Sequence, residues 1–329
     1  MSALLQRVRK TIQRHALCPP GTRLLVGLSG GSDSVALVLL LRELGEHGGF
    51  SVAGLAHLNH RLRASADNDE AFCRALADRL DCRIVVEGAD VKGYARDRGL
   101  STEDAARRIR YDFLERAAGS VGADRIAVGH TQDDQAETFL LKLMRGAGLT
   151  GLAGIYPKRG RVVRPLLDVS RGELRDHLRE QGEQWVEDET NAGLENPRNR
   201  VRHVILPELD SAAGGATRPA IARAAALARE DGEWLDAVAC ERYLALVETT
   251  AEGLAMDVAA AAGEPRAIRR RLLLRALRVG AGGREVSQEH VELAMAVLEG
   301  SCGGADVPGG RVERSRGKLV VVQRKVVPK

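Results

Sequence analysis

The chain has 329 residues, which exceeds the usual size of one compact domain and predicts a large domain with one or two smaller modules. Apolar residues make up 44% of it and aromatic residues 3%, a balance that excludes a disordered chain and favours aliphatic helices packed on a parallel sheet. The 49 Lys and Arg against 45 Asp and Glu leave a net charge of +4, which does not by itself indicate a nucleic-acid partner.

The cysteines and the apolar runs bear on the cellular compartment. The five cysteines are scattered and form no Cys-x-x-Cys pair, which excludes a disulfide framework or a zinc ribbon. Residues 1–17 place apolar side chains at helical spacing among basic ones, without the continuous apolar run of a signal peptide, and no later run reaches transmembrane length. We therefore expect a cytoplasmic protein with reduced thiols and no membrane partner.

Short apolar runs alternate with helical patterns from Arg23 to Gly129, which is typical of βαβ units and a parallel sheet. A short strand near 161–164 and a helix opened by Ser170 and Glu173 complete this α/β unit, a catalytic domain expected to span 1–210. The predicted strands are 24–28, 52–57, 83–87 and 125–129, and the predicted helices are 33–44, 67–80, 101–118 and 133–144.

The rest of the chain has a different character. Small residues at 211–215 break the pattern, and Ala- and Arg-rich helical spacing then continues through Glu299, which predicts a helical domain over 211–300. Two Gly-Gly pairs and the run 318–327 predict a small β-hairpin tail over 301–329. The predicted fold class is α/β, with a parallel-sheet domain, a C-terminal helical domain and the hairpin tail.

A Gly-rich turn joins the first predicted strand to its helix. Its glycines let backbone N–H groups converge, its small hydroxyls add donors, and the helix dipole favours an anion. The Gly-Lys-Ser/Thr ending of kinase and GTPase loops is missing, and a turn without a ligand is the alternative. The residues of the turn are Ser29, Gly30, Gly31, Ser32, Asp33 and Ser34.

This Ser-Gly-Gly-x-Asp-Ser pattern resembles the PP-loop of the ATP pyrophosphatase superfamily, whose members cleave ATP to AMP and pyrophosphate. The resemblance implies that the six residues of the loop bind ATP through its pyrophosphate portion. It also implies that Asp33 helps to bind Mg²⁺, so that ATP and Mg²⁺ are the expected cofactors.

A second motif directly follows the strand predicted at 52–57, at the edge where open α/β sheets bind ligands. Two histidines three residues apart suit a metal site, but the other ligands of such a site are missing. The run from His57 to Arg63 is similar to the His-x-Asn-His-x-Leu-Arg signature of the tRNA(Ile)-lysidine synthetases. That resemblance implies that His57 lies near the adenosine of ATP, and that Asn59, His60 and Arg63 lie near the target base of the tRNA.

Two carboxylates open the helix predicted at 133–144. Asp134 and Glu137 are three residues apart and so share one helix face. Acidic residues at a helix start often serve only as caps that complement the helix dipole, and this alternative stays open. The surrounding run 129–148 resembles the second hallmark of the same family, which implies that Asp134 and Glu137 hold the amines of free L-lysine.

Several arginines are candidates for phosphate binding. Arg107 and Arg108 fit a solvated helix face. Arg110 occupies the position where the family pattern has a functional arginine, which implies that it binds an ATP phosphate or stabilises the charge that develops at the α-phosphate. Arginines at alternate positions of 196–203 suit tRNA phosphates or, alternatively, pairing with the acidic run 187–189. The segment resembles the family's Arg-Asn-x-x-Arg region, which implies that its arginines contact the tRNA. These are Arg198, Arg200 and Arg202, and whether Arg200 or Arg202 is the functional arginine stays open.

A third basic stretch, 266–278, carries six arginines and no acidic residue. Apolar residues at helical spacing are expected to face a core there, which leaves the arginines to bind tRNA phosphates. A helix whose arginines are only solvated is the alternative. The tRNA-binding candidates from this stretch are Arg270, Arg271 and Arg275.

The resemblance implies one reaction. The O2 of the wobble cytidine in a tRNA(Ile) with a CAU anticodon attacks the α-phosphate of ATP, and the ε-amine of lysine then displaces AMP at C2. The implied catalytic residues are Asp33, Arg110, Asp134 and Glu137. Two alternatives remain, a PP-loop enzyme that thiolates a tRNA base and a non-catalytic tRNA-binding protein. The oligomeric state stays open, with a homodimer as one candidate.

Overall fold

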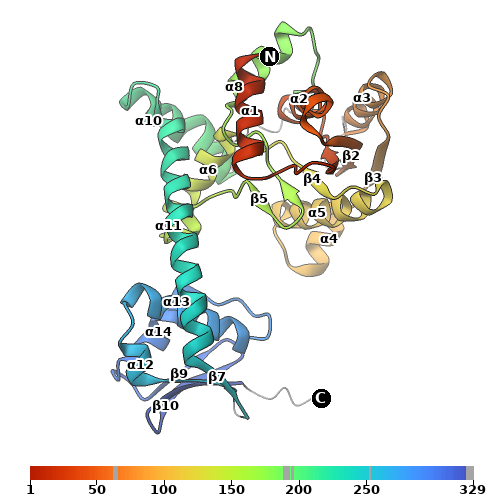
Figure 1. Cartoon of the computed structure of the whole chain (residues 1–329). Helices are drawn as coiled ribbons and strands as arrows, with labels where there is room; N and C mark the ends of the chain where they lie inside the picture. The colour runs from red at the N-terminus through yellow and green to blue at the C-terminus, as the bar shows by residue number, and fades with distance from the viewer. Residues whose placement is uncertain (62–65, 188–192, 194–195, 252, 324–329) are drawn as a thin grey trace. The chain divides into compact units, whose positions relative to one another are not determined.

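The computed structural model describes residues 1–61, 66–187, 193, 196–251 and 253–323 (Figure 1). The chain packs into two compact units, Met1–Leu227 and Ala228–Lys329, and the division falls within the helix α11 (Thr217–Leu246). These packing units do not coincide with the three domains expected from the sequence, whose limits stay predictions. Within the described residues, no helix combines the length and the apolar character needed to cross a membrane.

The first unit is built on a six-stranded sheet in the order β3-β2-β1-β4-β6-β5. All neighbours are parallel except the edge strand β5, which runs antiparallel to β6. The predicted parallel sheet is confirmed, and the sequence pattern missed only β5. The strands are β1 (Arg23–Gly27), β2 (Ser51–Asn59), β3 (Ile84–Gly88), β4 (Arg125–Ala127), β5 (Lys158–Arg159) and β6 (Val162–Val163).

Helices cover both faces of this sheet, as the unbroken apolar run of β1 requires. Leu24 and Val26 join the buried cluster that includes helices α1, α2 and α8, while Leu25 points to the opposite face and joins the cluster formed with α5. The sequence pattern missed the short helices α4 and α7. The helices are α1 (Ala3–Arg14), α2 (Ser32–Gly48), α3 (Ala66–Arg79), α4 (Val91–Arg98), α5 (Thr102–Val121), α6 (Gln132–Leu143), α7 (Leu149–Leu152) and α8 (Arg171–Glu180).

A broken helical segment follows in the first unit. It consists of α9 (Pro197–Arg200), the π-helical η2 (Val201–Ile205) and α10 (Leu206–Ala212). Val201 and Leu206 are fully buried and pack with Ala136 and Leu140 of α6. This packing brings the arginines of 198–202 next to the start of α6.

The second unit contains a five-stranded antiparallel sheet in the order β7-β8-β11-β10-β9. The predicted hairpin is β10–β11, and it is part of this larger sheet. The expectation of continuous helix through Glu299 is wrong at β7 and β8, because pairing with β11 buries Leu254 and Met256. The elements are β7 (Val247–Thr250), β8 (Gly253–Asp257), α12 (Val258–Ala262), α13 (Arg266–Gly280), α14 (Gln288–Leu298), β9 (Gly304–Val307), β10 (Gly310–Ser315) and β11 (Lys318–Gln323).

Candidate functional site

The Gly-rich turn lies between the end of β1 and the start of α2, as the sequence predicts. Gly30 has a φ of +90°, a conformation that side chains disfavour, and this bend is closed by Ser34. The Ser34 hydroxyl donates to the carbonyl of Gly31 at 2.9 Å, and its oxygen accepts from the backbone N–H of Ser29 at 3.1 Å. Gly31 is the N-cap residue of α2 and provides no side-chain cap, so the N–H groups at this helix start suit an anion.

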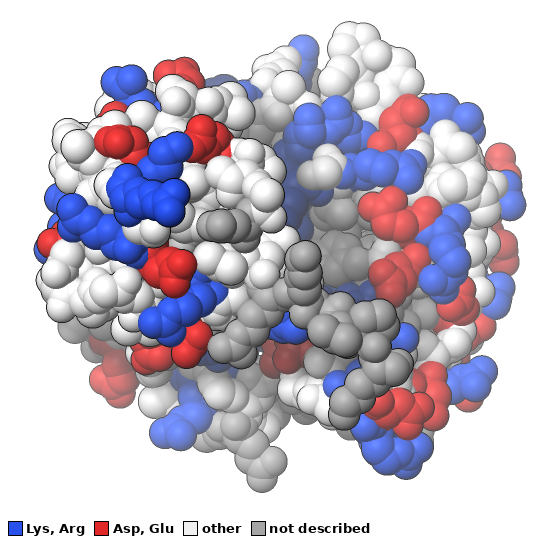
Figure 2. Space-filling model, turned by 90° about the horizontal axis from the view of Figure 1, so that it is seen from below, with Lys and Arg blue, Asp and Glu red and all other residues white. Residues whose placement is uncertain are grey.

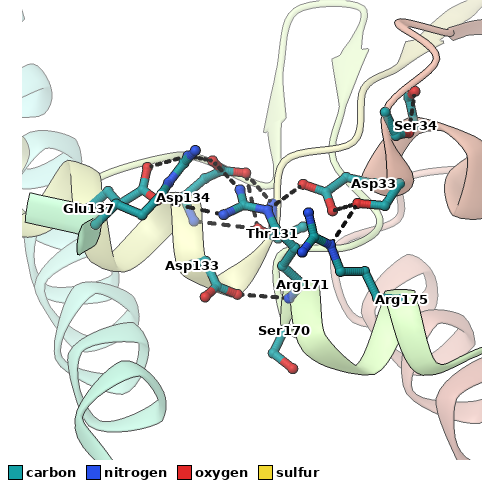
Figure 3. A network of polar contacts seen from close by, with 12 residues as sticks. Asp33, Ser34, Thr131, Asp133, Asp134, Glu137, Ser170, Arg171 and Arg175 are labelled. Atoms are coloured by element: carbon teal, nitrogen blue, oxygen red, sulfur yellow. Dashed lines mark hydrogen bonds and ion pairs between the residues drawn. The ribbon is translucent and has the colours of Figure 1, made fainter. Parts of the chain in front are cut away.

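Asp134 caps α6 and also faces the interior of the site. Its Oδ2 accepts from the backbone N–H of Thr131 at 2.8 Å and from the Thr131 hydroxyl at 3.0 Å, which completes a capping box. Its Oδ1 lies 3.2 Å from Nη2 of Arg171 (Figure 3). The capping alternative therefore describes one oxygen of this carboxylate, and the other oxygen remains available to the site.

Arg171, which the sequence analysis did not single out, joins the phosphate loop to α6. Its Nε donates to Asp33 Oδ2 at 2.9 Å, and its Nη1 lies 3.8 Å from Oε1 of Glu137 (Figure 3). Its backbone N–H donates to Asp133 at 2.8 Å, so the start of α8 is tied to the start of α6. One guanidinium thus bridges the carboxylates predicted for magnesium and for lysine.

Two further arginines bind Glu137, whose side chain is 0% exposed. Arg198 Nε donates to Oε2 at 2.7 Å, and Arg202 donates from Nε to Oε1 at 2.6 Å and from Nη2 to Oε2 at 3.1 Å. Arg200 is exposed, so Arg202 is the one of the two undecided arginines that reaches this cluster. The predicted alternative partner Glu187 pairs with Arg175 instead, at 3.0 Å, and residues 188 and 189 lie outside the described residues.

Charges and burial set the protonation of the site. Burial raises the pKa of Asp33, and the neighbouring Arg171 opposes this rise. Burial acts in the same sense on Asp134, but the positive charges of Arg171 and Arg198 outweigh it and hold the pKa of Asp134 below its ordinary value. Burial lowers the pKa of His130 to about 3, so this histidine is neutral, and its Nδ1 accepts from Arg164 Nε at 3.0 Å.

The residues of the second motif occupy different environments. His57 is 3% exposed and donates from Nδ1 to the Leu28 carbonyl at 2.9 Å, while its buried Nε2 has no hydrogen-bond partner among the described residues. Asn59 is buried and donates to Asp67 at 2.9 Å. Burial together with the positive charge of Arg110 lowers the pKa of half-buried His60 to about 4.

Of the two remaining arginines, Arg110 and Arg63, the structure describes Arg110. Arg110 is exposed, and its guanidinium lies 5.8 Å from the ring centre of Tyr111, whose hydroxyl contacts Arg164 at 3.3 Å. Arg63 lies outside the described residues. The arrangement therefore brings Asp33, Asp134 and Glu137 together with Arg198 and Arg202.

The arginines of α13 belong to the second unit and are partly engaged there. Arg270 pairs with Glu292 at 2.9 Å, Arg271 pairs with Asp236 at 2.8 Å, and Arg275 lies 5.5 Å from the ring centre of Tyr243. Exposed ion pairs of this kind are worth about 1 kcal/mol or less, so phosphates can compete for these guanidinium groups.

Curated proteins of known name are similar to this chain. Curated proteins named tRNA(Ile)-lysidine synthase include one from Geobacter sulfurreducens, 39% identical over 297 residues, which are 89% of this chain and 62% of that protein. Another, from Thermus thermophilus, is 44% identical over 213 residues, which are 65% of this chain and 41% of that protein. The chain thus spans less than two thirds of the length of either relative.

A solved structure and a family description extend the comparison. The structure is the U34-tRNA thiolase NcsA from Methanococcus maripaludis with its iron–sulfur cluster, at a TM-score of 0.54 and 17% identity over 68% of this chain and 76% of that one, a likeness of fold alone. The family description is that of the PP-loop domain, and it matches residues 3–209, which confirms the prediction made from the Gly-rich turn. This chain belongs to the PP-loop domain family.

Proposed function

We propose that the protein ligates free L-lysine to C2 of the wobble cytidine of a tRNA(Ile) with a CAU anticodon, through an adenylated intermediate. The observation that carries the proposal is the pair Asp134 and Glu137, which one guanidinium joins to Asp33 of the phosphate loop. An amine-binding pair beside an ATP site is what this ligation needs. The names of the relatives support the same reaction.

The phosphate loop performs the activation. A cytosine oxygen is a poor leaving group, and transfer of AMP to it makes it a good one. The uncapped start of α2 and the hydroxyls of the loop stabilise the departing pyrophosphate. The loop residues proposed to bind it are Ser29, Gly30, Gly31, Ser32 and Ser34. Arg110 adds positive charge near the α-phosphate, and His57 Nε2 offers a buried acceptor to the adenosine.

The donor chemistry of the site fits a magnesium ion. Asp33 and Asp134 bind the same guanidinium, so two carboxylate groups face one cationic position beside the phosphate loop. Mg²⁺ is usually held by one or two carboxylates, with phosphate and water oxygens as the other ligands. When bound, it neutralises phosphate charge. Asp33 would hold it.

The carboxylates of α6 select the second substrate. Asp134 and Glu137 favour an amino acid with a cationic side chain over neutral ones, and one of them accepts a proton as the amine attacks C2. Asn59, His60, Arg63, Arg198, Arg200 and Arg202 are proposed to contact the tRNA near the target base. Arg270, Arg271 and Arg275 are proposed to contact its phosphates.

The two buried cysteines, Cys18 and Cys73, give no support to base thiolation, the rival PP-loop chemistry. Burial raises the pKa of Cys73 to about 12 and that of Cys18 to about 12, so both remain thiols near neutral pH. A protonated thiol is a poor nucleophile for sulfur transfer.

The test is transfer of labelled lysine to unmodified tRNA(Ile) with ATP and Mg²⁺. Asp134→Asn removes the charge but keeps an oxygen that can accept the Thr131 hydrogen bonds, so a loss of transfer reports on lysine and not on the helix cap. Asp33→Ala should also abolish transfer. The matched control is Asp176→Asn, an exposed carboxylate of α8 bonded to Arg179, which should leave transfer unchanged. Wild-type protein that binds tRNA(Ile) but incorporates no lysine would refute the proposal.

A further inference from the structure

The carboxylates proposed to bind lysine are already occupied by arginine side chains. Glu137 accepts hydrogen bonds from Arg198 and Arg202. The Oδ1 atom of Asp134 accepts one from Arg171 and lies 3.8 Å from Nη2 of both Arg198 and Arg202. The three carboxylates of Asp33, Asp134 and Glu137 therefore balance the charges of the three arginines. An incoming ammonium group has to displace a guanidinium and would leave it without a partner in a largely buried place, which is costly.

Arg171 differs from the other two arginines because it reaches both substrate sites. It contacts Asp33 in the phosphate loop and Asp134 on α6, and its side chain is only 20% exposed. Arg175, one turn further along α8, also points to the loop, where its Nε lies 3.5 Å from the Ser32 hydroxyl (Figure 3). This face of α8 therefore directs cationic groups at the position where ATP phosphates are proposed to bind.

We propose that Arg171 couples the two sites, so that ATP binding opens the lysine site. Triphosphate in the loop is a stronger partner for a guanidinium than the shared carboxylates are, because it carries more charge and accepts bidentate hydrogen bonds. Arg171 turns to the phosphates and releases Asp134 from its shortest ion pair, so that Oδ1 can accept the amine. ATP binds before lysine, and this inference rests on the function proposed above.

The coupling has a measurable size. A ligand that frees the site of a second ligand raises the affinity of that ligand by a factor that is commonly about 5 to 150, and the effect is reciprocal. We expect lysine to bind wild-type protein about tenfold or more tightly with Mg²⁺ and α,β-methylene-ATP than without nucleotide. Lysine should raise the affinity for the analogue by the same factor.

Arg171→Gln separates coupling from simple loss of structure. Without the guanidinium, Asp134 Oδ1 loses its shortest ion pair and keeps only the two 3.8 Å pairs with Arg198 and Arg202, whether or not nucleotide is bound. We therefore expect lysine to bind the variant equally well with and without nucleotide, and more tightly than it binds nucleotide-free wild type. The analogue itself should bind more weakly to the variant. Arg171→Lys, which keeps a cation, should retain part of the coupling. Calorimetric titration of the folded, full-length chain measures each affinity.

The matched control is Arg179→Gln on the same helix, because Arg179 is 61% exposed and pairs with Asp176 away from the cluster. It should couple the ligands as wild type does. Nucleotide-independent lysine affinity in wild type, or full coupling in Arg171→Gln, would overturn the inference. The lysine-transfer assay then distinguishes failure of the coupling from failure of the proposed function. If the protein transfers lysine but shows no coupling, only the coupling is rejected. If it shows neither transfer nor coupling, the proposed function is rejected as well.

Discussion

In the site, the negative charges of the carboxylates and the positive charges of the arginines neutralise one another as a group. Glu137 is the extreme case, because its side chain is fully buried and lies between Arg198 and Arg202. Neither arginine is more than 29% exposed, so solvent compensates poorly for a lost partner. The same carboxylate that is proposed to select lysine therefore also holds α6 to the segment 197–205.

Glu137→Gln should destabilise the first unit. It leaves two guanidinium groups without their carboxylate in a poorly hydrated place, and breaking such a pair typically costs about 3–5 kcal/mol, or somewhat less where water reaches the arginines. Urea denaturation of the whole chain measures the change. Arg200→Gln, a change at an exposed residue of the same segment, should alter the free energy of unfolding by about 0.5 kcal/mol or less. Equal effects of the two substitutions would contradict this view of the cluster.

Asp33 should reduce the stability of the ligand-free protein at neutral pH. Burial raises its pKa in the folded state above the ordinary value of 3.8, so its ionised form is disfavoured by folding. This unfavourable contribution is absent below the unfolded-state pKa and grows as pH rises through the folded-state pKa. Asp33→Asn should therefore raise the Tm at pH 7, on the order of 1–3 °C, and the gain should disappear as the pH falls toward 4. A gain that persists at acidic pH would show that the carboxylate charge is not the cause.

The sequence predicted the carboxylates of the site but not the cation that joins them. Asp33, Asp134 and Glu137 follow strands and open helices, so their positions at one sheet edge could be inferred from motif and topology. Arg171 bonds to Asp33 across 138 residues of sequence, and only the docking of α8 against α2 brings them together. The one local signal was the predicted cap of Ser170 and Glu173, which places Arg171 at the first position of its helix.

At the scale of elements, the start of α8 controls the direction of Arg171. Ser170 Oγ accepts from the backbone N–H of Glu173 at 3.3 Å, and Glu173 accepts in return from the backbone N–H of Ser170 at 3.0 Å. This capping box fixes the first turn, from which Arg171 reaches the phosphate loop. Elements with such local signals were predicted well, whereas β7 and β8 were missed because strands of four and five residues are too short to show a period of their own. Their state is decided only when β11 pairs with β8 and β8 with β7.

Ser170→Ala should lower both stability and ATP affinity. Loss of an N-cap typically costs about 1 kcal/mol, and fraying of the first turn here would also misplace Arg171. Ser287→Ala is the matched control, because Ser287 forms a capping box with His290 at the start of α14 in the second unit. We expect both variants to unfold more easily, and only Ser170→Ala to bind α,β-methylene-ATP more weakly in calorimetric titration. An equal loss of nucleotide affinity in both variants would mean that the cap of α8 has no specific role.

At the scale of the whole molecule, the net charge is small, and one face shows both signs of charge interspersed. Lys and Arg alternate with Asp and Glu over the face drawn in Figure 2, in keeping with the net charge of +4. On α13, Ile268, Leu272 and Leu273 are buried as the apolar spacing predicts, and the arginines between them pair with acidic residues of the same unit. Sequence spacing predicted the buried face of this helix. The partners of its arginines depend on tertiary packing and cannot be predicted from the local sequence.

The arginines of α13 should contribute to tRNA affinity through phosphates alone. Replacing Arg270, Arg271 and Arg275 together by Gln in the full chain should weaken tRNA binding and reduce the slope of log K against log salt concentration by about 2, since each lost phosphate contact removes roughly 0.7–0.9 from it. The KM for ATP should not change, because these residues lie in the second unit and the phosphate loop lies in the first. Arg311→Gln, an exposed residue of β10, is the control and should leave the slope as it is in wild type. An unchanged slope in the triple variant, measured by filter binding over a range of salt concentrations, would assign these arginines to the solvated surface and leave tRNA binding to the arginines of the first unit.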